Sequence, residues 1–163
     1  MPIERARNEL VTQAFYKGCS HVLFIDDDIW PDSTYSAIKL VESNLPIIGG
    51  MCRRRKLGGE FIITPQNLQN ERGVTEVKET GCGFLLIDMK VLENMAGQYP
   101  IDEYSFFEWS GSTRNPTSED ISFCRKAYRL GYKIYVDRDV TCGHHDFIIY
   151  DDSRDGFSPL VRK

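Results

Sequence analysis

The sequence predicts an α/β fold: one domain built on a mainly parallel sheet that helices flank. Two observations support this prediction, because helical and strand patterns alternate along the chain and the strands are continuous apolar runs. Strands of parallel sheets give such runs because both of their faces are buried. The length of 163 residues, with 41% hydrophobic and 27% charged residues, suits one globular domain. We take residues 1–150 as this domain and 151–163 as a polar C-terminal tail.

The first predicted elements are a helix and a buried strand. Residues 3–17 have helical periodicity and Gly18 supplies the stop, after which HVLFI (21–25) is a short apolar run typical of a strand. The residues expected to form the buried stripe of this helix are Ile3, Ala6, Leu10, Ala14 and Phe15.

A second helix and a second strand follow. Pro31 suits the first turn of a helix, and Pro46 ends it. PIIGGMC (46–52) then predicts another buried strand. The stripe expected to be buried on this second helix is Tyr35, Ile38 and Val41.

Residues 53–79 are polar and rich in turn residues, which indicates an excursion with a hairpin around FIIT (61–64). CGFLLI (82–87) predicts a third buried strand, and Asp88 is placed to cap a short helix over 89–95. The last predicted elements are a helix from Ser118, ended by Gly131, and a strand over 132–136. The helix is expected to bury Ile121, Cys124, Ala127 and Tyr128.

The overall composition excludes several function classes. A net charge of −4 argues against electrostatic binding of nucleic acid. The five cysteines are scattered and contain no C-x-x-C pair, so we expect reduced thiols in a cytoplasmic protein. No apolar run approaches the roughly 20 residues of a transmembrane helix.

Three successive aspartates, Asp26, Asp27 and Asp28, follow the first predicted strand. Alternation along a strand would point Asp26 and Asp28 the same way and Asp27 elsewhere. Two carboxylates on one side are hard oxygen ligands suited to Mg²⁺ or Mn²⁺. The alternative is a helix N-cap with an acidic first turn, which the helix dipole also favours.

Two further groups of residues extend this acidic motif. Glu119 and Asp120 open a predicted helix, and His144 with His145 follows the fourth predicted strand. Each group alone has an ordinary structural explanation, as a helix start or a loop histidine. Their order along the chain is what favours a functional site.

In that order the chain resembles the GT-A-type glycosyltransferases, in particular the family-two members of bacteria and viruses. The matching stretches are ARNELV (6–11), HVLFIDDDIWPD (21–32), PIIGGMCRRRK (46–56), ETGCGFLLIDMKVLENM (79–95) and SEDISFCRKAYRLGYKIYVDRDVTCGHH (118–145). The resemblance implies a GT-A-like, Rossmann-like fold. It also implies transfer of a sugar from a nucleotide-sugar donor to a hydroxyl acceptor such as a glycan, with inversion.

The resemblance assigns roles to the acidic residues and to one histidine. Asp28 and His144 would hold Mn²⁺ or Mg²⁺, and Asp26 would bind the metal or the ribose of the donor. Such a metal neutralises charge on the leaving diphosphate. Asp120 would be the general base that takes the acceptor proton, and Glu119 would orient the acceptor.

The resemblance also places other residues around the donor and the acceptor. Gly81 and Gly83 would let the backbone approach the donor sugar, although a tight entry into a strand explains them equally well. The remaining candidates are Arg7, Asn8, Asp27 and Lys56 at the donor, and Trp109 stacking on the acceptor. Arg7 and Asn8 are equally plausible as residues of a helix surface.

Relatives in that family begin with a strand and a loop that grip the nucleotide, and this chain starts after them. We therefore expect an exposed sheet edge and self-association. Two other functions stay open: a non-catalytic relic or binding subunit of the same fold, and a phosphohydrolase of the haloacid dehalogenase type. The latter also places Asp-x-Asp after an apolar strand, but Ile29, Trp30 and Pro31 fit its motif poorly.

Overall fold

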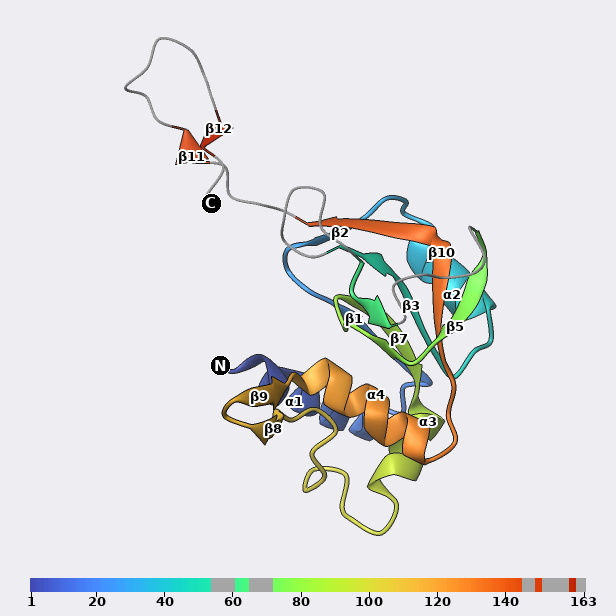
Figure 1. Ribbon diagram of the computed structural model, residues 1–163. Coiled ribbons are helices and arrows are strands. Elements are labelled where there is room, and N and C mark those ends of the chain that lie inside the picture. Colours follow the sequence, from blue (N-terminus) through green and yellow to red (C-terminus); the bar gives the residue numbers. More distant parts are fainter. Residues whose placement is uncertain (54–60, 65–71, 145–148, 151–158, 161–163) are drawn as a thin grey trace.

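A computed structural model of the chain describes residues 1–53, 61–64, 72–144, 149–150 and 159–160. At its centre is a six-stranded sheet in the order β1-β7-β3-β10-β2, with β5 pairing to β10 (Figure 1). The strands are β1 (His21–Ile25), β2 (Ile29–Pro31), β3 (Ile47–Cys52), β5 (Val74–Val77), β7 (Phe84–Asp88) and β10 (Ile134–His144).

The direction of the strands differs from the prediction. Four of the five pairings in this sheet are antiparallel, and only β3 with β10 is parallel. The mainly parallel, Rossmann-like sheet that the sequence analysis predicts is therefore wrong. The physical reason is that β7 is antiparallel to both of its neighbours, and a strand buried on both faces has the same apolar pattern in either direction.

The sheet curls until it is nearly closed. Strands β1 and β2 stand at opposite ends of the strand order, yet only residues 26–28 connect them. Four Cα–Cα steps reach at most about 15 Å, whereas four strand spacings in a flat sheet cover about 19 Å. The two ends of the sheet must therefore approach each other beyond Ile25, at the C-terminal end of β1, and the three aspartates lie there.

Helices cover both faces of the sheet (Figure 1). Helices α1 (Ile3–Tyr16), α3 (Met89–Ala96) and α4 (Glu119–Arg129) share one apolar core, which includes Leu85 and Ile87 of β7. Helix α2 (Ser36–Glu42) lies against the other face, where its Leu40 joins Phe84 and Leu86. Alternate residues of β7 thus supply the two cores, as the period of a strand requires.

Several predicted boundaries are confirmed. Helix α1 ends at Tyr16, and Gly18 has a φ of +66°, a conformation that favours glycine. Asp88 caps α3, because its side chain accepts a hydrogen bond of 2.8 Å from the Lys90 N–H. The predicted excursion over 53–79 is described only in part: β4 (Ile63–Thr64) pairs with β6 (Glu79–Thr80), and β5, also within the excursion, belongs to the central sheet.

The second predicted helix starts later than expected. Pro31 belongs to β2, and α2 begins at Ser36. The stripe predicted to be buried, namely Tyr35, Ile38 and Val41, is exposed. Helix α2 instead buries Ser36 and Leu40, because its apolar residues exceed what one face of seven residues can bury.

The buried faces of α1 and α4 also differ in part from the prediction. Helix α1 buries Arg7 and Val11, and it leaves Ile3, Leu10 and Phe15 exposed. In α4 the predicted Cys124 and Ala127 are buried, whereas Tyr128 is exposed. The charged side chain of Arg7, buried on α1, needs a partner of opposite charge, and such partners lie in the candidate site.

The remaining strands form small hairpins. Strands β8 (Ser110–Ser112) and β9 (Asn115–Thr117) pair just before α4, and β11 (Ile149–Tyr150) pairs with β12 (Pro159–Leu160). Among the described residues, no helix combines the length and the apolar character that crossing a bilayer requires.

Candidate functional site

The three aspartates form a tight turn between β1 and β2. The Ile29 N–H donates to the Asp26 carbonyl at 3.0 Å, and the Asp26 N–H donates to the Gly83 carbonyl at 3.0 Å. Because these residues turn instead of continuing a strand, alternation along the chain does not apply to them. Asp26 contacts Arg7, Asp28 lies beside His144, and Asp27 is exposed.

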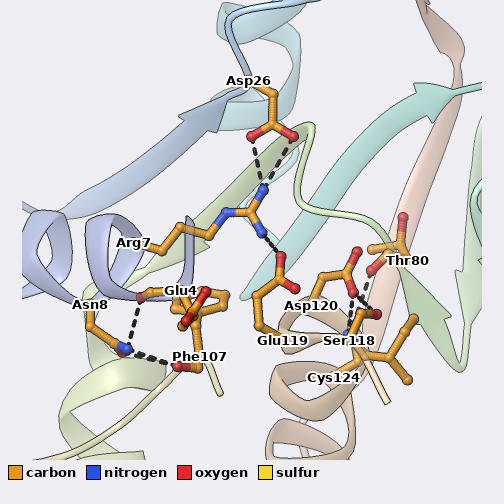
Figure 2. A network of polar contacts seen from close by, with 11 residues as sticks. Glu4, Arg7, Asn8, Asp26, Thr80, Phe107, Ser118, Glu119, Asp120 and Cys124 are labelled. Carbon is orange, nitrogen blue, oxygen red and sulfur yellow. Dashed lines mark hydrogen bonds and ion pairs between the residues drawn. The ribbon is translucent and has the colours of Figure 1, made fainter. Parts of the chain in front are cut away.

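Arg7 joins two acidic residues from distant parts of the chain (Figure 2). Its Nη2 donates to Asp26 Oδ1 at 2.8 Å and to Oδ2 at 3.2 Å, and its Nη1 donates to Glu119 Oε1. The side chains of Arg7 and Glu119 are only 5% and 7% exposed. The guanidinium therefore ties α1, the end of β1 and the start of α4 together.

The surroundings of Arg7 keep it charged. Burial by itself lowers the pKa of the guanidinium, but nearby groups that favour the charged form, Asp26 and Glu119 among them, raise this pKa on balance. The rings of Phe24 and Phe107 lie 5.9 and 6.0 Å from the guanidinium carbon. One cation thus faces two carboxylates, which leaves this cluster with a net negative charge.

Asp120 lies next to Glu119 but has a different environment. Its Oδ1 accepts hydrogen bonds from the Ser118 hydroxyl and, at 2.7 Å, from the Ile121 N–H. Both bonds fix the carboxylate, and both leave Oδ2 for another contact. The side chain is half-buried, so a substrate hydroxyl could reach it.

The glycines of Gly81-Cys82-Gly83 pass between these carboxylates. A Cβ added at Gly81 would lie 3.5 Å from Asp120 Oδ2, and one added at Gly83 would lie 3.6 Å from Asp26 Oδ2. The same Cβ atoms would also meet Ile62 at 3.0 Å and Ile29 at 3.1 Å. The nearby carboxylates support the functional explanation of these glycines, and the close isoleucine side chains support the packing explanation.

His144 ends β10, opposite Ile29 in the register of β2. This pairing places the imidazole beside Asp28, with 4.0 Å between His144 Nε2 and Asp28 Oδ1. The distance exceeds that of a hydrogen bond. The other ring nitrogen, Nδ1, is buried and has no hydrogen-bond partner among the described residues.

Asp28 and His144 fit the role of two ligands of one divalent cation. Ligand atoms lie about 2.0–2.2 Å from such an ion, so two of them are at most about 4.4 Å apart. No group of three or more His, Cys, Asp or Glu side chains gathers in the described part of the chain, and Asp26 faces Arg7. As far as the described residues go, the other ligands would be waters or substrate oxygens.

Other candidate residues lie elsewhere. Asn8 accepts hydrogen bonds from the N–H groups of Phe106 and Phe107 at 2.8 and 3.0 Å and donates to the Phe107 carbonyl at 2.8 Å. It therefore anchors the loop before β8. Trp109 is exposed next to that strand, and Lys56 lies outside the described residues.

Two hydrogen bonds of the candidate site could not be predicted from the spacing of residues in the sequence. The Ser118 hydroxyl binds Asp120, and the loop carbonyl of Phe107 binds Asn8. A signal for Arg7 was present, because Arg7 lies four positions from both Ile3 and Val11 on one side of a helix.

A cavity of about 260 Å³ lies apart from these carboxylates. It is lined by Lys78, Glu79, Arg125, Tyr128 and Arg129. The last three belong to the C-terminal half of α4, whereas Asp120 is in its first turn. We therefore place the candidate site at the carboxylates and not at this cavity.

Comparison with known proteins finds likenesses among solved structures. No family profile and no curated protein matches the chain. The crystal structure of A197 from STIV is similar, with a TM-score of 0.62 over 90% of this chain and 69% of that one. The two sequences are 15% identical, so the likeness concerns the fold alone. With the mixed sheet, these findings overturn the assignment to the GT-A-type glycosyltransferases.

Proposed function

We propose that this chain transfers a sugar from a nucleotide-sugar donor to an acceptor hydroxyl and that a divalent cation assists the transfer. The proposal depends mainly on the pair of Asp28 and His144, whose separation suits two ligands of one ion. Asp120 supports it, because this carboxylate keeps one oxygen for a further contact. The glycines at 81 and 83 border the carboxylates of Asp120 and Asp26.

Asp28 and His144 would hold Mn²⁺ or Mg²⁺. When bound, the cation would offset the negative charge of the departing nucleoside diphosphate. Asp26 is held by Arg7, so a metal or ribose contact from Asp26 would use an oxygen that it shares with the guanidinium.

Asp120 would act as the general base. The acceptor oxygen forms a bond to the anomeric carbon of the donor, the bond from that carbon to the diphosphate breaks, and the bonding electron pair leaves with the diphosphate. The hydroxyl proton passes to Asp120 Oδ2. Ser118 and the Ile121 N–H hold Oδ1 and so fix the direction in which Oδ2 points.

Arg7 has a positioning role in this scheme. It orients Glu119 and Asp26, and through Glu119 it fixes the start of the helix on which Asp120 stands. Glu119 itself is buried against Arg7, so its influence on the acceptor would be indirect. The backbone at Gly81 and Gly83 would approach the donor sugar.

The structure gives less support to a phosphohydrolase. In that reaction Asp26 would be the nucleophile, but both of its oxygens accept hydrogen bonds from Arg7. A binding protein without catalysis would keep the same cation pair, so activity must be measured to separate it from a transferase.

Binding of Mn²⁺, measured by electron paramagnetic resonance, tests the cation pair directly. Asp28→Asn and His144→Ala should each weaken Mn²⁺ binding at least about tenfold, because each removes one protein ligand. The matched controls are Asp102→Asn, an exposed aspartate, and His21→Ala. Unchanged affinity in both site variants would remove the basis of the proposal.

Release of nucleoside diphosphate from a panel of nucleotide sugars then tests transfer. A donor that binds at a hundredfold excess over its dissociation constant should stabilise the chain by about 2.7 kcal/mol in a thermal shift. Mn²⁺ binding with no response to any donor would favour the binding subunit over the enzyme.

A further inference from the structure

The outer edge of β1 presents unpaired backbone groups. Among the described residues, β1 pairs only with β7. The Asp26 N–H bonds to Gly83, and the Ser20 carbonyl accepts from the Met89 N–H, so the even-numbered residues direct their backbone groups toward β7. The N–H and C=O groups of the odd-numbered residues therefore point away from the sheet. These residues are His21, Leu23 and Ile25.

This edge lacks the usual protection against pairing. Edge strands are commonly short, or carry Lys, Pro or a bulge. Strand β2 has three residues and ends in Pro31, and β5 carries Glu76. In contrast, HVLFI of β1 has five residues without Lys, Pro or Gly, and it pairs with β7 in an unbroken register.

On one face of the sheet, α2 exposes Val41 on its side away from β10. Lys39 reaches Asp137 of β10, with 3.2 Å between Nζ and Oδ2, so this side of α2 faces β10. Val41 is two positions later, about 200° around the helix, and so points away from β10. It is exposed, and Leu23 of β1 packs in the same core as α2.

On the other face of the sheet, α1 also exposes apolar side chains. Asn8 turns toward the 106–107 loop, where Phe107 stacks on Phe123 of α4 over the interior of the sheet. Leu10 is two positions from Asn8 and so points to the opposite side, beyond β1. Ile3 lies seven positions before Leu10, on the same side, and both are exposed. Helix α1, which packs on β1, thus leaves two apolar side chains exposed on its side away from the 106–107 loop.

We propose that a second copy of this chain occupies the space beside β1 and that its β1 pairs antiparallel with this β1 about a two-fold axis at Leu23. His21 would face Ile25 of the partner, Leu23 would face its equivalent, and Ile25 would face the partner's His21. All three pairs would be of the hydrogen-bonded kind, with about six backbone bonds in total.

A second copy suits this edge better than an unrelated strand. A two-fold axis brings the same surface from each copy, so the α1 helices lie side by side and Leu10 and Ile3 meet their equivalents. No charged side chain of β1 would face a like charge across the axis, because the strand has no Asp, Glu, Lys or Arg. The joined sheet would have β1 in its interior, which agrees with its continuous apolar sequence.

Light scattering during size-exclusion chromatography, over a range of concentrations, tests this dimer. The mass should approach twice 18.8 kDa at high concentration. Ile25→Lys should raise the dimer dissociation constant at least about tenfold, because it adds one ammonium group from each copy to the joined edge. The control is Val74→Lys on the edge strand β5, where Val74 is 42% exposed against 52% for Ile25.

A second pair of variants tests the helix contact. Leu10→Lys should also weaken the dimer, whereas Leu130→Lys at the end of α4 should not, although the two leucines are 51% and 48% exposed. A chain that stays monomeric at every concentration would overturn the proposal. So would a dimer that Ile25→Lys and Leu10→Lys leave intact.

Amide hydrogen exchange locates the contact residue by residue. Val22 and Phe24 bond to β7 and should exchange slowly at all concentrations, whereas Leu23 and Ile25 should become slow only in the dimer. Fast exchange of Leu23 and Ile25 in a dimeric sample would place the interface elsewhere and overturn the proposal.

Discussion

Arg7 on α1 and Glu119 at the start of α4 form an ion pair across 112 positions of the chain, and both side chains are almost completely buried. Asp26 shares the same guanidinium. The cluster thus connects a helix, a strand end and a second helix at the point where the candidate catalytic residues gather. Its integrity should matter to stability as well as to activity.

Replacing Arg7 should destabilise the fold strongly. Arg7→Met leaves Glu119 buried without its cation, and loss of one partner from a buried ion pair costs about 3–5 kcal/mol. Urea denaturation measures this change in the free energy of unfolding. The control is Arg125→Met, since Arg125 pairs with Glu79 at the surface and should cost at most about 1 kcal/mol. Equal effects of the two variants would contradict the buried pair.

Asn8 should act through the loop that it anchors. Asn8→Ala leaves the N–H groups of Phe106 and Phe107 without their acceptor, which should cost about 1–3 kcal/mol of unfolding free energy. Asn94→Ala, which removes an exposed hydrogen bond to Tyr132, is the control with a smaller expected cost. A selective loss of donor affinity in Asn8→Ala, with stability unchanged, would support the donor-binding role instead.

Asp120→Asn should separate binding from chemistry. The amide preserves the shape of the side chain but does not accept the acceptor proton, so transfer should fall by about 10²-fold or more. Donor and Mn²⁺ affinity should change little, because Asp28 and His144 are intact. Rates of diphosphate release alongside donor titrations measure both quantities. Full transfer activity in this variant would exclude Asp120 as the base.

Stability should fall in alkaline solution because of Cys124. Burial raises the pKa of this thiol from 9.0 to about 12, so the unfolded chain releases the proton at lower pH than the folded chain. The contribution of the protonated Cys124 thiol to the free energy of unfolding is therefore fully present below pH 9 and is lost as the pH rises toward 12. Cys124 alone should contribute at most about 1.4 kcal/mol per pH unit to this slope.

Cys124→Ala should flatten this dependence, whereas Cys19→Ala, at an exposed position, should keep it. Denaturation at several pH values between 9 and 12 gives the slopes. Burial also raises the pKa of Cys82, so part of the slope should persist in Cys124→Ala. Parallel slopes for the wild type and Cys124→Ala would contradict the assignment.

Local sequence signals predicted where the elements lie better than how they pack. Gly18 and Asp88 mark real ends of α1 and α3 because turn and capping chemistry acts over a few residues. The direction of β7 could not be predicted, because an apolar run carries no information on its partners. The buried faces predicted for α1 and α2 were wrong because both helices expose apolar residues, among them Leu10 and Val41.

The candidate site could be predicted only as a list of residue types. Asp120 and His144 were identified by motif order, but the turn at 26–28 separates Asp26 from Asp28 in a way that strand alternation does not allow. The link between Arg7 and Glu119 is a tertiary contact, so no local spacing encodes it.

The seam where the curled sheet nearly closes has a thermodynamic consequence. Strand β2 is held to β10 by three residue pairs, and one of them is His144 with Ile29, next to Asp28. Separation of β2 from β10 would move Asp28 away from His144, the two proposed cation ligands, while Asp26 stayed bound to Arg7. If the proposed cation binds there, its affinity and the pairing of β2 with β10 would reinforce each other by the same free energy.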